Sequence, residues 1–303
     1  MDLVIEAPRF PAPGEAIHGK NFRRACGGKG ANQACAVARM GMKAAIIGAV
    51  GADAFGDEML ASVRDAGVET AAVVRRAEVP SGAAMIVLDA SGQNQIVVAN
   101  GANDTLLEAD VAPHTELISR SQALVMQLET PVSGVVAAAD IARQAGVPVI
   151  FNPAPYSPVP ESLLQSCSFI IPNEGEAAHL TGIAIHDVVS AGAAARRLRQ
   201  IAPQANVLVT LGANGVWLDT DQFTGHVPGF AVTAVDTVGA GDTFIGAFAV
   251  QIVEGADIRE AARFGCAAAA IAVTRRGAQT SIPSRAEALA LKNDSMNTIR
   301  PQK

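Results

Sequence analysis

The residues at positions 236–244 have the types and spacing needed to hold a phosphate group. Gly239 and Gly241 precede a predicted helix over 242–254, so this loop can expose successive backbone N–H groups at a helix N-terminus. Such N–H groups, together with the helix dipole, form an anion-binding site. The segment is not a Walker A loop, because the Gly-Lys-Ser/Thr run is missing, and not a Rossmann fingerprint, because Phe244 replaces the last glycine.

Asp242 lies beside this loop and admits two interpretations. As a structural residue it is a helix N-cap, whose side chain accepts a hydrogen bond from a first-turn N–H group. As a catalytic residue it is a general base for a hydroxyl group that attacks a phosphoryl group. Phosphoryl transfer depends mainly on positioning and charge stabilisation, so one base and a row of N–H donors are sufficient for it.

A second glycine-rich turn lies at residues 27–33 and begins a predicted helix over 31–40. Its glycines allow a ligand to approach the backbone closely, while Lys29 and Asn32 offer hydrogen-bond donors on the first turn. Alone, such a turn also fits a helix cap with a surface lysine. Its combination with the loop at 236–244 strengthens the case for a ligand site.

These two segments resemble the two signatures of the ribokinase-like, or PfkB, family of carbohydrate kinases. The resemblance extends from Asp2 to about Pro283, which is nearly the whole chain. Further segments match in the order of the family at residues 11–15, 100–103, 127–131, 152–155, 172–176, 210–215 and 276–279. With so many ordered matches, the chain is identified as a member of this family.

The resemblance implies ATP-dependent phosphorylation of D-ribose at its 5-hydroxyl group, giving D-ribose 5-phosphate and ADP. Asp242 matches the catalytic base of the family, and its anion hole corresponds to Gly239, Ala240 and Gly241. The sugar-binding positions correspond to Asp2, Gly28, Lys29, Asn32, Glu129 and Asp242. Carboxylates suit a sugar because each one accepts hydrogen bonds from neighbouring hydroxyl groups.

The resemblance also implies a nucleotide site and two metal sites. The ATP-binding positions correspond to Asn173, Thr210, Leu211, Gly212, Ala213, Asn214, Gly215, Gly241 and Cys266. Glu176 matches a residue that holds Mg²⁺, and contact through water suits an ion that dehydrates reluctantly. An activating K⁺ site, formed mostly by backbone carbonyls, corresponds to Asp236, Val238, Ala272, Arg275, Gly277 and Ser281. Two alternatives stay open: Asn173 and Glu176 also fit a helix start, and Cys266 also fits a packed thiol.

Composition and charge exclude several other classes of protein. Half of the 303 residues are apolar, 17% are charged and the net charge is −6, which excludes intrinsic disorder and argues against nucleic-acid binding. The chain begins without a basic signal-peptide region, and its longest uncharged apolar stretch, 264–273, is too short to cross a bilayer. The cysteines and histidines show no metal-ligand spacing, which predicts reduced thiols in a cytoplasmic protein that has no membrane partner.

Short β-like runs alternate with helical segments from about residue 44 onwards. The predicted strands are 44–50, 123–127, 147–151, 168–171, 207–211 and 230–235, with a hairpin at 83–88 and 95–99. The predicted helices are 55–66, 133–144, 175–180, 188–201, 242–254 and 258–274. Apolar strands separated by helices indicate a mostly parallel sheet covered on both faces.

We therefore predict a single α/β domain over residues 1–291, which the resemblance makes a ribokinase-like three-layer αβα fold. A small β-sheet lid is expected from residues 2–26 and 83–99, and a disordered tail from 292–303. In the family this lid pairs two subunits, so the resemblance implies a homodimer.

The start of the chain departs from the family pattern. The matched Asp usually follows a glycine-containing strand with an Asn two residues before it, whereas Asp2 is the second residue here. That Asn lies on the 2-hydroxyl side of the sugar, so the marker that separates ribose from deoxyribose is absent. The missing strand is expected to leave apolar surface and unpaired edge groups in the sheet. We favour a misplaced start codon or a shortened chain over a natural short form.

Two other functions compete with a ribose kinase. A kinase for another sugar, such as 2-deoxyribose, shares every motif above, although Asn32, Glu129 and the segment 276–279 favour ribose. A non-catalytic sugar- or nucleotide-binding protein would result if the missing strand abolished turnover, although Asp242 is retained. A nicotinamide oxidoreductase lacks support, because the fingerprint and its ribose-binding acid are missing.

Overall fold

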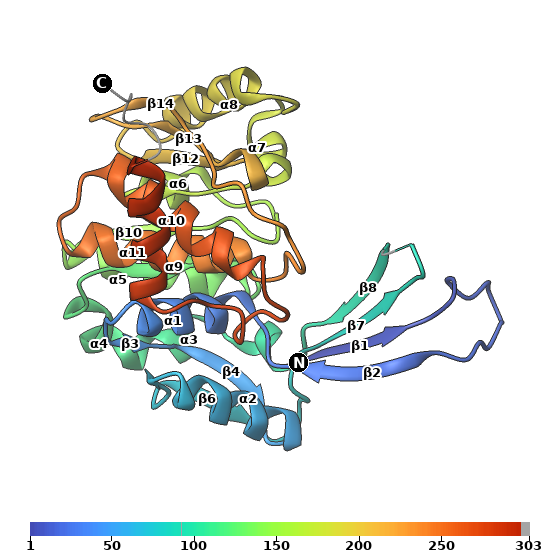
Figure 1. Ribbon diagram of the computed structural model, residues 1–303. Helices are drawn as coiled ribbons and strands as arrows, with labels where there is room; N and C mark the ends of the chain where they lie inside the picture. Colours follow the sequence, from blue (N-terminus) through green and yellow to red (C-terminus); the bar gives the residue numbers. More distant parts are fainter. Residues whose placement is uncertain (92, 298–303) are drawn as a thin grey trace.

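The computed structural model describes residues 1–91 and 93–297, which form a layered body with a projecting arm (Figure 1). In this part of the chain, the body contains a six-stranded sheet in the order β14-β13-β12-β11-β10-β9. Its strands are β9 (Leu124–Met126), β10 (Val149–Phe151), β11 (Phe169–Ile170), β12 (Asn206–Thr210), β13 (Val216–Asp219) and β14 (Thr224–Val227). The strands from β9 to β12 are parallel, whereas β13 and β14 are antiparallel, so the mostly parallel sheet is confirmed.

Helices connect the strands and cover both faces of this sheet. The α-helices of the described residues are α1 (Lys29–Arg39), α2 (Ala54–Asp65), α3 (Glu108–Val111), α4 (Thr115–Ser119), α5 (Val132–Gln144), α6 (Glu161–Gln165), α7 (Glu174–Thr181), α8 (Val188–Ile201), α9 (Ala240–Val253), α10 (Ile258–Ala272) and α11 (Arg285–Asn297). Short 3-10 helices occur at η1 (Gly101–Thr105), η2 (Ala112–His114) and η3 (Gly212–Asn214).

The burial of β12 shows why the body has three layers. Val207 and Val209 pack into a core with residues of α5 and α8, whereas Leu208 packs into a second core with residues of α9 and α10. Because successive strand residues point to opposite faces, this alternation means that both faces of the sheet are covered. The expected αβα architecture is confirmed.

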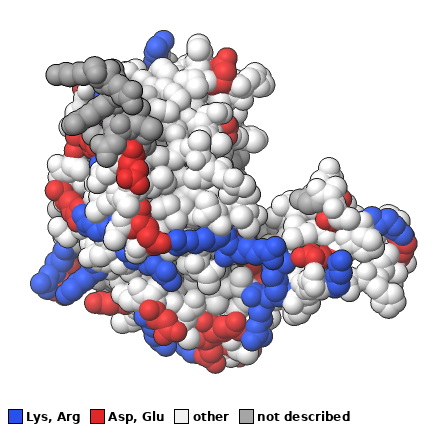
Figure 2. Space-filling view, in the orientation of Figure 1, with Lys and Arg blue, Asp and Glu red and all other residues white. Residues whose placement is uncertain are grey.

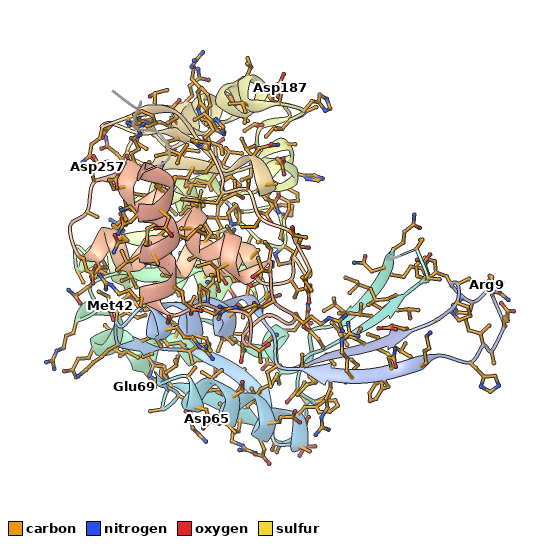
Figure 3. All side chains as sticks on the ribbon, viewed as in Figure 1. Arg9, Met42, Asp65, Glu69, Asp187 and Asp257 are labelled. Carbon is orange, nitrogen blue, oxygen red and sulfur yellow. The ribbon has the colours of Figure 1, made fainter. Side chains whose placement is uncertain are left out.

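A separate four-stranded sheet forms the arm, in the order β2-β1-β7-β8. Its strands are β1 (Asp2–Glu6), β2 (Lys20–Ala25), β7 (Ala83–Leu88) and β8 (Asn94–Ala99), which lie within the residue ranges expected for the lid. Arg9, at the outer end of the arm, pairs with Glu15 (Figure 3). Large apolar side chains remain exposed on the arm, including Phe22 at 66% and Val97 at 71%.

Two short strand pairs lie apart from the six-stranded sheet. These are β3 (Ala44–Ala45) with β5 (Val68–Glu69), and β4 (Gly48–Gly51) with β6 (Val73–Arg76). Within the described residues, β4 and β9 each pair with a strand on one side only. A mostly apolar cavity of about 650 Å³ is lined by both strands, for example by Val50 and Val125. In the described part of the chain, both strands thus have a side without a strand partner and line the same cavity.

Two of the predicted strands are wrong in detail. Residues 230–235 form no strand, because the Val235 N–H donates to the Val273 carbonyl beyond α10, so this backbone is fastened to a helix end. The run at 44–50 divides into β3 and β4, because β3 pairs with β5 whereas β4 pairs with β6.

The C-terminal helix continues past residue 292, where we expected a disordered tail. Ala288 of α11 is fully buried in a core with Phe264 of α10. One turn further on, the Lys292 ammonium lies 2.7 Å from the Glu260 carboxylate of α10. These contacts hold α11 against α10, so the prediction is wrong for residues 292–297, and residues 298–303 lie outside the described residues.

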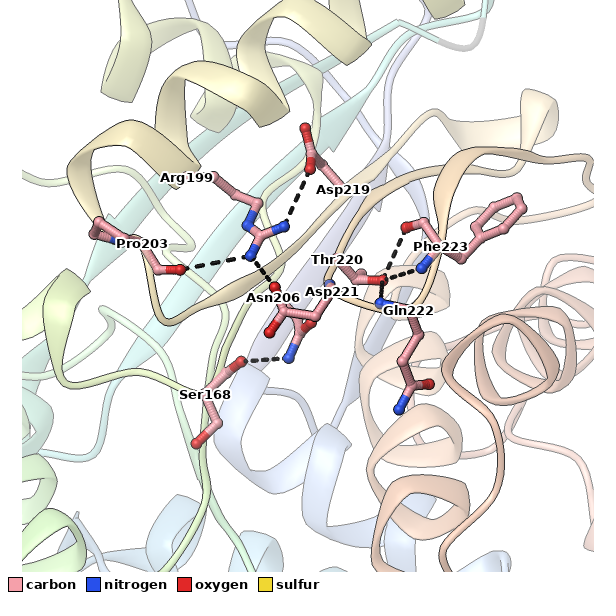
Figure 4. Close-up of polar contacts among 9 residues, drawn as sticks. All are labelled: Ser168, Arg199, Pro203, Asn206, Asp219, Thr220, Asp221, Gln222 and Phe223. Atoms are coloured by element: carbon pink, nitrogen blue, oxygen red, sulfur yellow. Dashed lines mark hydrogen bonds and ion pairs between the residues drawn. The ribbon is translucent and has the colours of Figure 1, made fainter.

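A polar cluster fixes the amino end of β12, the end opposite Thr210. The Arg199 guanidinium of α8 contacts Asp219, Asp221 and the Pro203 carbonyl (Figure 4). Asp219 is only 8% exposed, so the guanidinium compensates a carboxylate that is largely removed from water. The cluster ties the β13–β14 hairpin to α8.

The composition led to expectations about the charged side chains, the helices and the cysteines. Basic and acidic side chains intermix on the face shown in Figure 2. The described part of the chain has no helix that is long and apolar enough to cross a membrane. The four cysteines are free thiols, and burial raises the pKa of both Cys167 and Cys266 to about 12.

Candidate active site

Asp242 lies in the first turn of α9 and is 7% exposed. Its Oδ2 accepts a hydrogen bond from Asn32 Nδ2 at 2.9 Å, and its Oδ1 accepts one from Gln33 Nε2 at 2.9 Å. Burial raises the pKa of Asp242, whereas the Lys29 ammonium and the two amide donors oppose this shift. Gly239 is the N-cap of α9 and the Asp242 side chain bonds to α1, so the N-cap interpretation of Asp242 is wrong.

The loop before α9 has the shape of an anion hole. Gly239 has a φ of 74°, and a Cβ there would lie 3.0 Å from Ala278, so this position requires glycine. Gly241 has no atom near the place of a Cβ, so a ligand can approach the first N–H groups of α9. The positive end of the helix dipole lies at the same point. Gly239, Ala240 and Gly241 thus surround a helix N-terminus beside Asp242.

Helices α1 and α9 cross at close range, and this crossing brings the two glycine-rich segments together. A Cβ at Gly246 of α9 would lie 2.5 Å from the Ala36 Cβ of α1, so the approach requires glycine. The crossing places Asn32 and Gln33 within hydrogen-bond distance of Asp242, although 210 and 209 positions separate them in the sequence.

Two carboxylates frame the turn that begins α1. The Lys29 N–H donates to Glu129 Oε2 at 2.7 Å, and burial raises the pKa of Glu129 while this N–H opposes the shift. Asp2 faces the same turn, because a Cβ at Gly27 would lie 2.6 Å from Asp2 Oδ2. Burial raises the pKa of Asp2 as well. Of the predicted sugar residues, Asp2, Gly28 and Glu129 line the 650 Å³ cavity, whereas Lys29 and Asp242 line a second cavity.

A smaller, polar cavity of about 210 Å³ is lined by other residues that were predicted for the site. Its lining includes Lys29, Asn173, Glu176, Thr210, Gly239, Gly241 and Asp242. It lies where β12 ends at Thr210 and where Asn173 follows β11, and these two residues bridge each other. Ligands of open α/β sheets bind at this carboxyl edge of the strands. Residues of the predicted sugar turn, anion loop and nucleotide site therefore line one cavity.

The predicted nucleotide turn joins β12 to β13. Its centre is the exposed helix η3, which comprises Gly212, Ala213 and Asn214. The Leu211 N–H donates to the Gly215 carbonyl at 2.8 Å, and a Cβ at Gly215 would lie 2.2 Å from the Val227 carbonyl oxygen. We call this turn, residues 210–215, the shelf, because its exposed centre lies beside the 210 Å³ cavity that Thr210 lines.

Cys266 lies in α10. Its side chain is buried in α10 and packs in the core that contains Phe244 and Val216. The 210 Å³ cavity is lined by other residues. This position agrees with the packed-thiol alternative.

Glu176 and Asn173 form a reciprocal capping box at the start of α7. Asn173 Oδ1 accepts from the Glu176 N–H at 2.8 Å, and the Glu176 carboxylate accepts from the Asn173 N–H and Nδ2, both at 2.9 Å. Burial raises the pKa of Glu176, and the Asn173 N–H opposes this shift. The helix-start alternative is thus realised. Each carboxylate oxygen keeps a second lone pair, so contact with Mg²⁺ through water is compatible with the box.

The loop after α10 lies beside the loop before α9. Asp236 Oδ2 accepts from the Gly277 N–H at 2.9 Å, and its Oδ1 accepts from the Val238 N–H at 3.1 Å. Ser281 is fully buried, and its hydroxyl donates to the Ala278 carbonyl at 2.8 Å. Both oxygens of the Asp236 carboxylate thus accept hydrogen bonds from the loops. The backbone carbonyls of these loops are the remaining oxygen donors that would suit a K⁺ ion.

Ala272 and Arg275, the other residues of the predicted K⁺ site, lie at the end of α10. The Arg275 N–H donates to the Ala272 carbonyl at 3.0 Å, and the Arg275 side chain pairs with Glu287 of α11. Across the described residues, no group of three or more His, Cys, Asp or Glu side chains is placed to hold a metal ion. A cation site in these loops therefore depends on carbonyl oxygens.

Three amide side chains near Asp242 had no predicted role. Gln33 Nε2 also contacts Asn152 Oδ1 at 3.2 Å, and Gln33 Oε1 accepts from Gln127 Nε2 at 2.5 Å. Gln127 and Asn152 directly follow the buried strands β9 and β10. A polar residue directly after a parallel strand is the sequence signal that identifies such positions.

Comparison with known proteins agrees with this geometry. The family described as "pfkB family carbohydrate kinase" matches residues 1–285. A ribokinase of Haemophilus influenzae is 44% identical over 288 residues, covering 95% of this chain and 94% of that protein. A deoxyribokinase of Salmonella typhi is 37% identical over 286 residues, covering 94% and 93%. The structure of Arabidopsis thaliana ribokinase complexed with ribose and ATP has a TM-score of 0.90 and 34% identity, covering 96% and 95%. The chain belongs to the pfkB family of carbohydrate kinases.

Proposed function

We propose that this kinase transfers the γ-phosphoryl group of ATP to the 5-hydroxyl group of D-ribose. The observation that carries the proposal is Asp242, a buried carboxylate held by the Asn32 amide beside the first N–H groups of α9. A base and an anion hole in one cavity meet the requirements of phosphoryl transfer. The similarity to ribokinases, one of them solved with ribose and ATP, supports ribose as the acceptor.

Asp242 is the general base of this reaction. One of its oxygens takes the proton of the 5-hydroxyl group while the hydroxyl oxygen bonds to the γ-phosphorus. The bond from the γ-phosphorus to the β,γ-bridging oxygen breaks, and ADP leaves with that electron pair. Burial raises the pKa of Asp242 and strengthens it as a proton acceptor, while Lys29 and the two amides favour its ionised form.

The charge of the transferred group is stabilised by fixed donors. The N–H groups of Gly239, Ala240 and Gly241 lie at the start of α9, where the helix dipole has its positive end. The Ala240 N–H makes only a long bond of 3.3 Å to the Thr237 carbonyl, which a phosphoryl oxygen would replace. Lys29 lines the same 210 Å³ cavity and adds a full positive charge. Because these groups are held by the fold, they need no reorganisation during the reaction.

Asn32 and two carboxylates hold the sugar. Asn32 Oδ1 is buried and has no hydrogen-bond partner among the described residues. An unpaired buried acceptor costs about 1–3 kcal/mol, and a sugar hydroxyl group that donates to it removes this cost. Asp2 and Glu129 lie on the other side of the turn and accept from further hydroxyl groups.

The nucleotide lies on the shelf formed by residues 210–215, with its phosphates directed at the start of α9. Glu176 holds Mg²⁺ through water, and the carbonyl groups of the loops around Asp236 and Ser281 hold K⁺. When bound, Mg²⁺ offsets the negative charge of the phosphates. The oxygen donors present at both places suit these hard cations.

A kinase for 2-deoxyribose is the second candidate. It is favoured by the deoxyribokinase relative, which covers nearly the same share of the chain as the ribokinase relative. The deciding experiment measures ATP consumption with D-ribose, 2-deoxy-D-ribose, D-fructose and adenosine. We expect the highest kcat/KM with D-ribose. A higher kcat/KM with 2-deoxy-D-ribose would favour the second candidate. If no compound stimulates ATP consumption, the protein is a sugar- or nucleotide-binding protein and not a kinase.

The arm sheet supports a homodimer. Met85 and Val97 lie opposite each other on one face of β7 and β8 and are 62% and 71% exposed, and Ile96 and Val98, on the other face of β8, are also exposed. Such a run of apolar side chains on a thin projecting sheet is typical of a protein–protein interface. A second copy of the arm offers the same surface and would bury it by symmetric pairing.

A further inference from the structure

A chain of amide side chains leads from the central sheet to Asp242. Asn152 Nδ2 donates to the Ile171 carbonyl at 2.8 Å, just beyond β11. Asn152 Oδ1 accepts from Gln33 Nε2 at 3.2 Å, and the same Nε2 donates to Asp242 Oδ1 at 2.9 Å. From the other side, Gln127 Nε2 donates to Gln33 Oε1 at 2.5 Å.

The backbone anchor determines the direction of every bond in this chain. The Ile171 carbonyl can only accept, so Asn152 must direct its NH₂ group at the carbonyl and its oxygen at Gln33. Gln33 then meets two acceptors, Asn152 Oδ1 and Asp242 Oδ1, and must direct its NH₂ group at both. A flipped Gln33 amide would place its oxygen against two other oxygens. The donor at Asp242 is therefore fixed by the sheet.

Asn32 and Gln33 hold the two oxygens of Asp242 but differ in what remains of their amides. Asn32 Oδ1 is buried and has no hydrogen-bond partner among the described residues. Gln33 is 2% exposed, and its two N–H groups and its oxygen all have protein partners. Asn32 thus keeps an unused acceptor, whereas Gln33 connects Asp242 to the protein frame.

We propose that Gln33 is a positioning residue that fixes the orientation of the Asp242 carboxylate for proton transfer, with Gln127 and Asn152 holding the Gln33 amide in turn. This inference rests on the proposed function, in which Asp242 is the general base. It assigns the task of aiming the base to an amide that does not itself contact the reacting atoms.

The groups around Asp242 determine how the loss of Gln33 changes the pKa of this carboxyl group. Lys29 of α1 favours the ionised carboxylate, whereas Glu129, after β9, and Glu176 of α7 add negative charge nearby. Gln33 donates to the ionised form, so its removal raises the pKa of Asp242. A general base acts only when ionised, and the acid limb of the rate profile therefore moves to higher pH.

The test compares three variants with the wild type in the dependence of kcat on pH. Gln33→Met keeps the shape and removes the donors, and we expect a kcat about ten- to a hundredfold lower with an unchanged KM for ATP. We expect its acid limb to move up by about one pH unit. Gln33→Glu places a second carboxyl group against Asp242, so its shift is larger. Gln127→Met removes only the outer bond, so its shift is smaller and in the same direction.

A second measurement does not require turnover. Carbon-13 NMR of labelled aspartate follows the titration of the Asp242 carboxyl group, assigned by its loss in Asp242→Asn. The inference is overturned if both Gln33 variants keep the wild-type acid limb and titration while only their melting temperature falls. If Gln33→Met does not fold, Gln127→Met decides by the same readings. An upward shift by NMR in a protein that no sugar stimulates would reject the proposed function and the proton transfer, and would keep only the hold of Gln33 on the Asp242 carboxylate.

Discussion

Replacing Asp242 by Asn removes the proposed base while preserving the shape of the site. The new amide oxygen accepts from Gln33 Nε2, as Asp242 Oδ1 does at 2.9 Å. The new NH₂ group meets Asn32, whose Oδ1 is buried and unpaired among the described residues, so a flip of the Asn32 amide satisfies both side chains. The substitution thus deletes one charge and keeps both hydrogen bonds to the side chain at position 242. Because the flip turns the Asn32 NH₂ group towards the proposed sugar, kcat at saturating D-ribose reports on the base, and KM for D-ribose reports on the flip.

The expected loss of activity follows from the role of a general base. Proton transfer to a positioned side chain contributes about a hundred- to ten-thousandfold to the rate, so we expect kcat to fall by that factor. Among the described residues, the Asp242 side chain bonds to Asn32 and Gln33 and not to the nucleotide turn at residues 210–215. The Kd for ATP should therefore change by no more than about twofold, which is a change in binding free energy of less than about one kcal/mol.

The same substitution has an expected effect on stability. A carboxyl group whose pKa is raised on folding stabilises the protein below its unfolded-state pKa, and this contribution is lost as the pH rises through the folded-state pKa. Burial raises the pKa of Asp242, so its ionised form opposes folding at pH 7. Asp242→Asn should therefore melt higher than the wild type at pH 7. The difference should vanish as the pH falls towards 3.8, the ordinary pKa of an aspartate carboxyl group.

The assay is steady-state ATP consumption at saturating D-ribose, with ATP binding and thermal melting measured on the same preparations. Asp219→Asn is the matched control, because Asp219 is also buried but pairs with Arg199 at the opposite end of β12. We expect the control to lose stability and to keep its kcat. The reasoning is refuted if Asp242→Asn retains a kcat within tenfold of the wild type, or if Asp219→Asn loses as much activity.

Four other predictions concern the metals, the arm and the apolar cavity. Glu176→Gln should raise the Mg²⁺ concentration for half-maximal turnover several-fold without unfolding α7, and equal Mg²⁺ titrations would contradict a role in holding the ion. Potassium should raise kcat over sodium at equal ionic strength, and identical rates would reject the carbonyl site. Val97→Lys should convert a dimer into a monomer by light scattering, and a wild type that is monomeric at high concentration would contradict the arm interface. Ala138→Leu should raise the melting temperature, because Ala138 lines the 650 Å³ cavity and the larger side chain can fill it. Ala139→Leu should lower the melting temperature, because Ala139 is packed in the core. An equal fall in melting temperature for both variants would show that the cavity cannot accept a side chain.

The features that sequence patterns predicted well are those that depend on local physics. Helix α8 was predicted with its observed bounds, Val188–Ile201, because an amphipathic period and an Asp187 N-cap define its start. The convergence of the two glycine-rich segments was predicted from the family resemblance. The contact that produces it depends on Gly246, a glycine inside an apolar helix whose pattern gives no sign of a partner.

The features that were missed depend on long-range pairing. The segment 230–235 has the composition of a strand, but it pairs with no strand of the described residues, and the Val235 N–H donates to the Val273 carbonyl instead. The Gln33 network joins residues from α1, β9 and β10, and each amide alone resembles an ordinary polar residue. Sequence shows that such residues are polar, whereas only the fold shows which atoms they meet.

The charges of the molecule are arranged differently at the site and on the surface. Burial raises the pKa of the four site carboxyl groups, those of Asp2, Glu129, Glu176 and Asp242. On the surface, the Arg275 guanidinium lowers the pKa of Glu287 to about 2. Under the proposed function, sugar hydroxyl groups and Mg²⁺ would bind these desolvated carboxylates and offset the cost of their burial. Because a ligand that relieves such groups binds only the folded chain, ribose and Mg²⁺-ATP should together raise the stability of this protein more than either does alone.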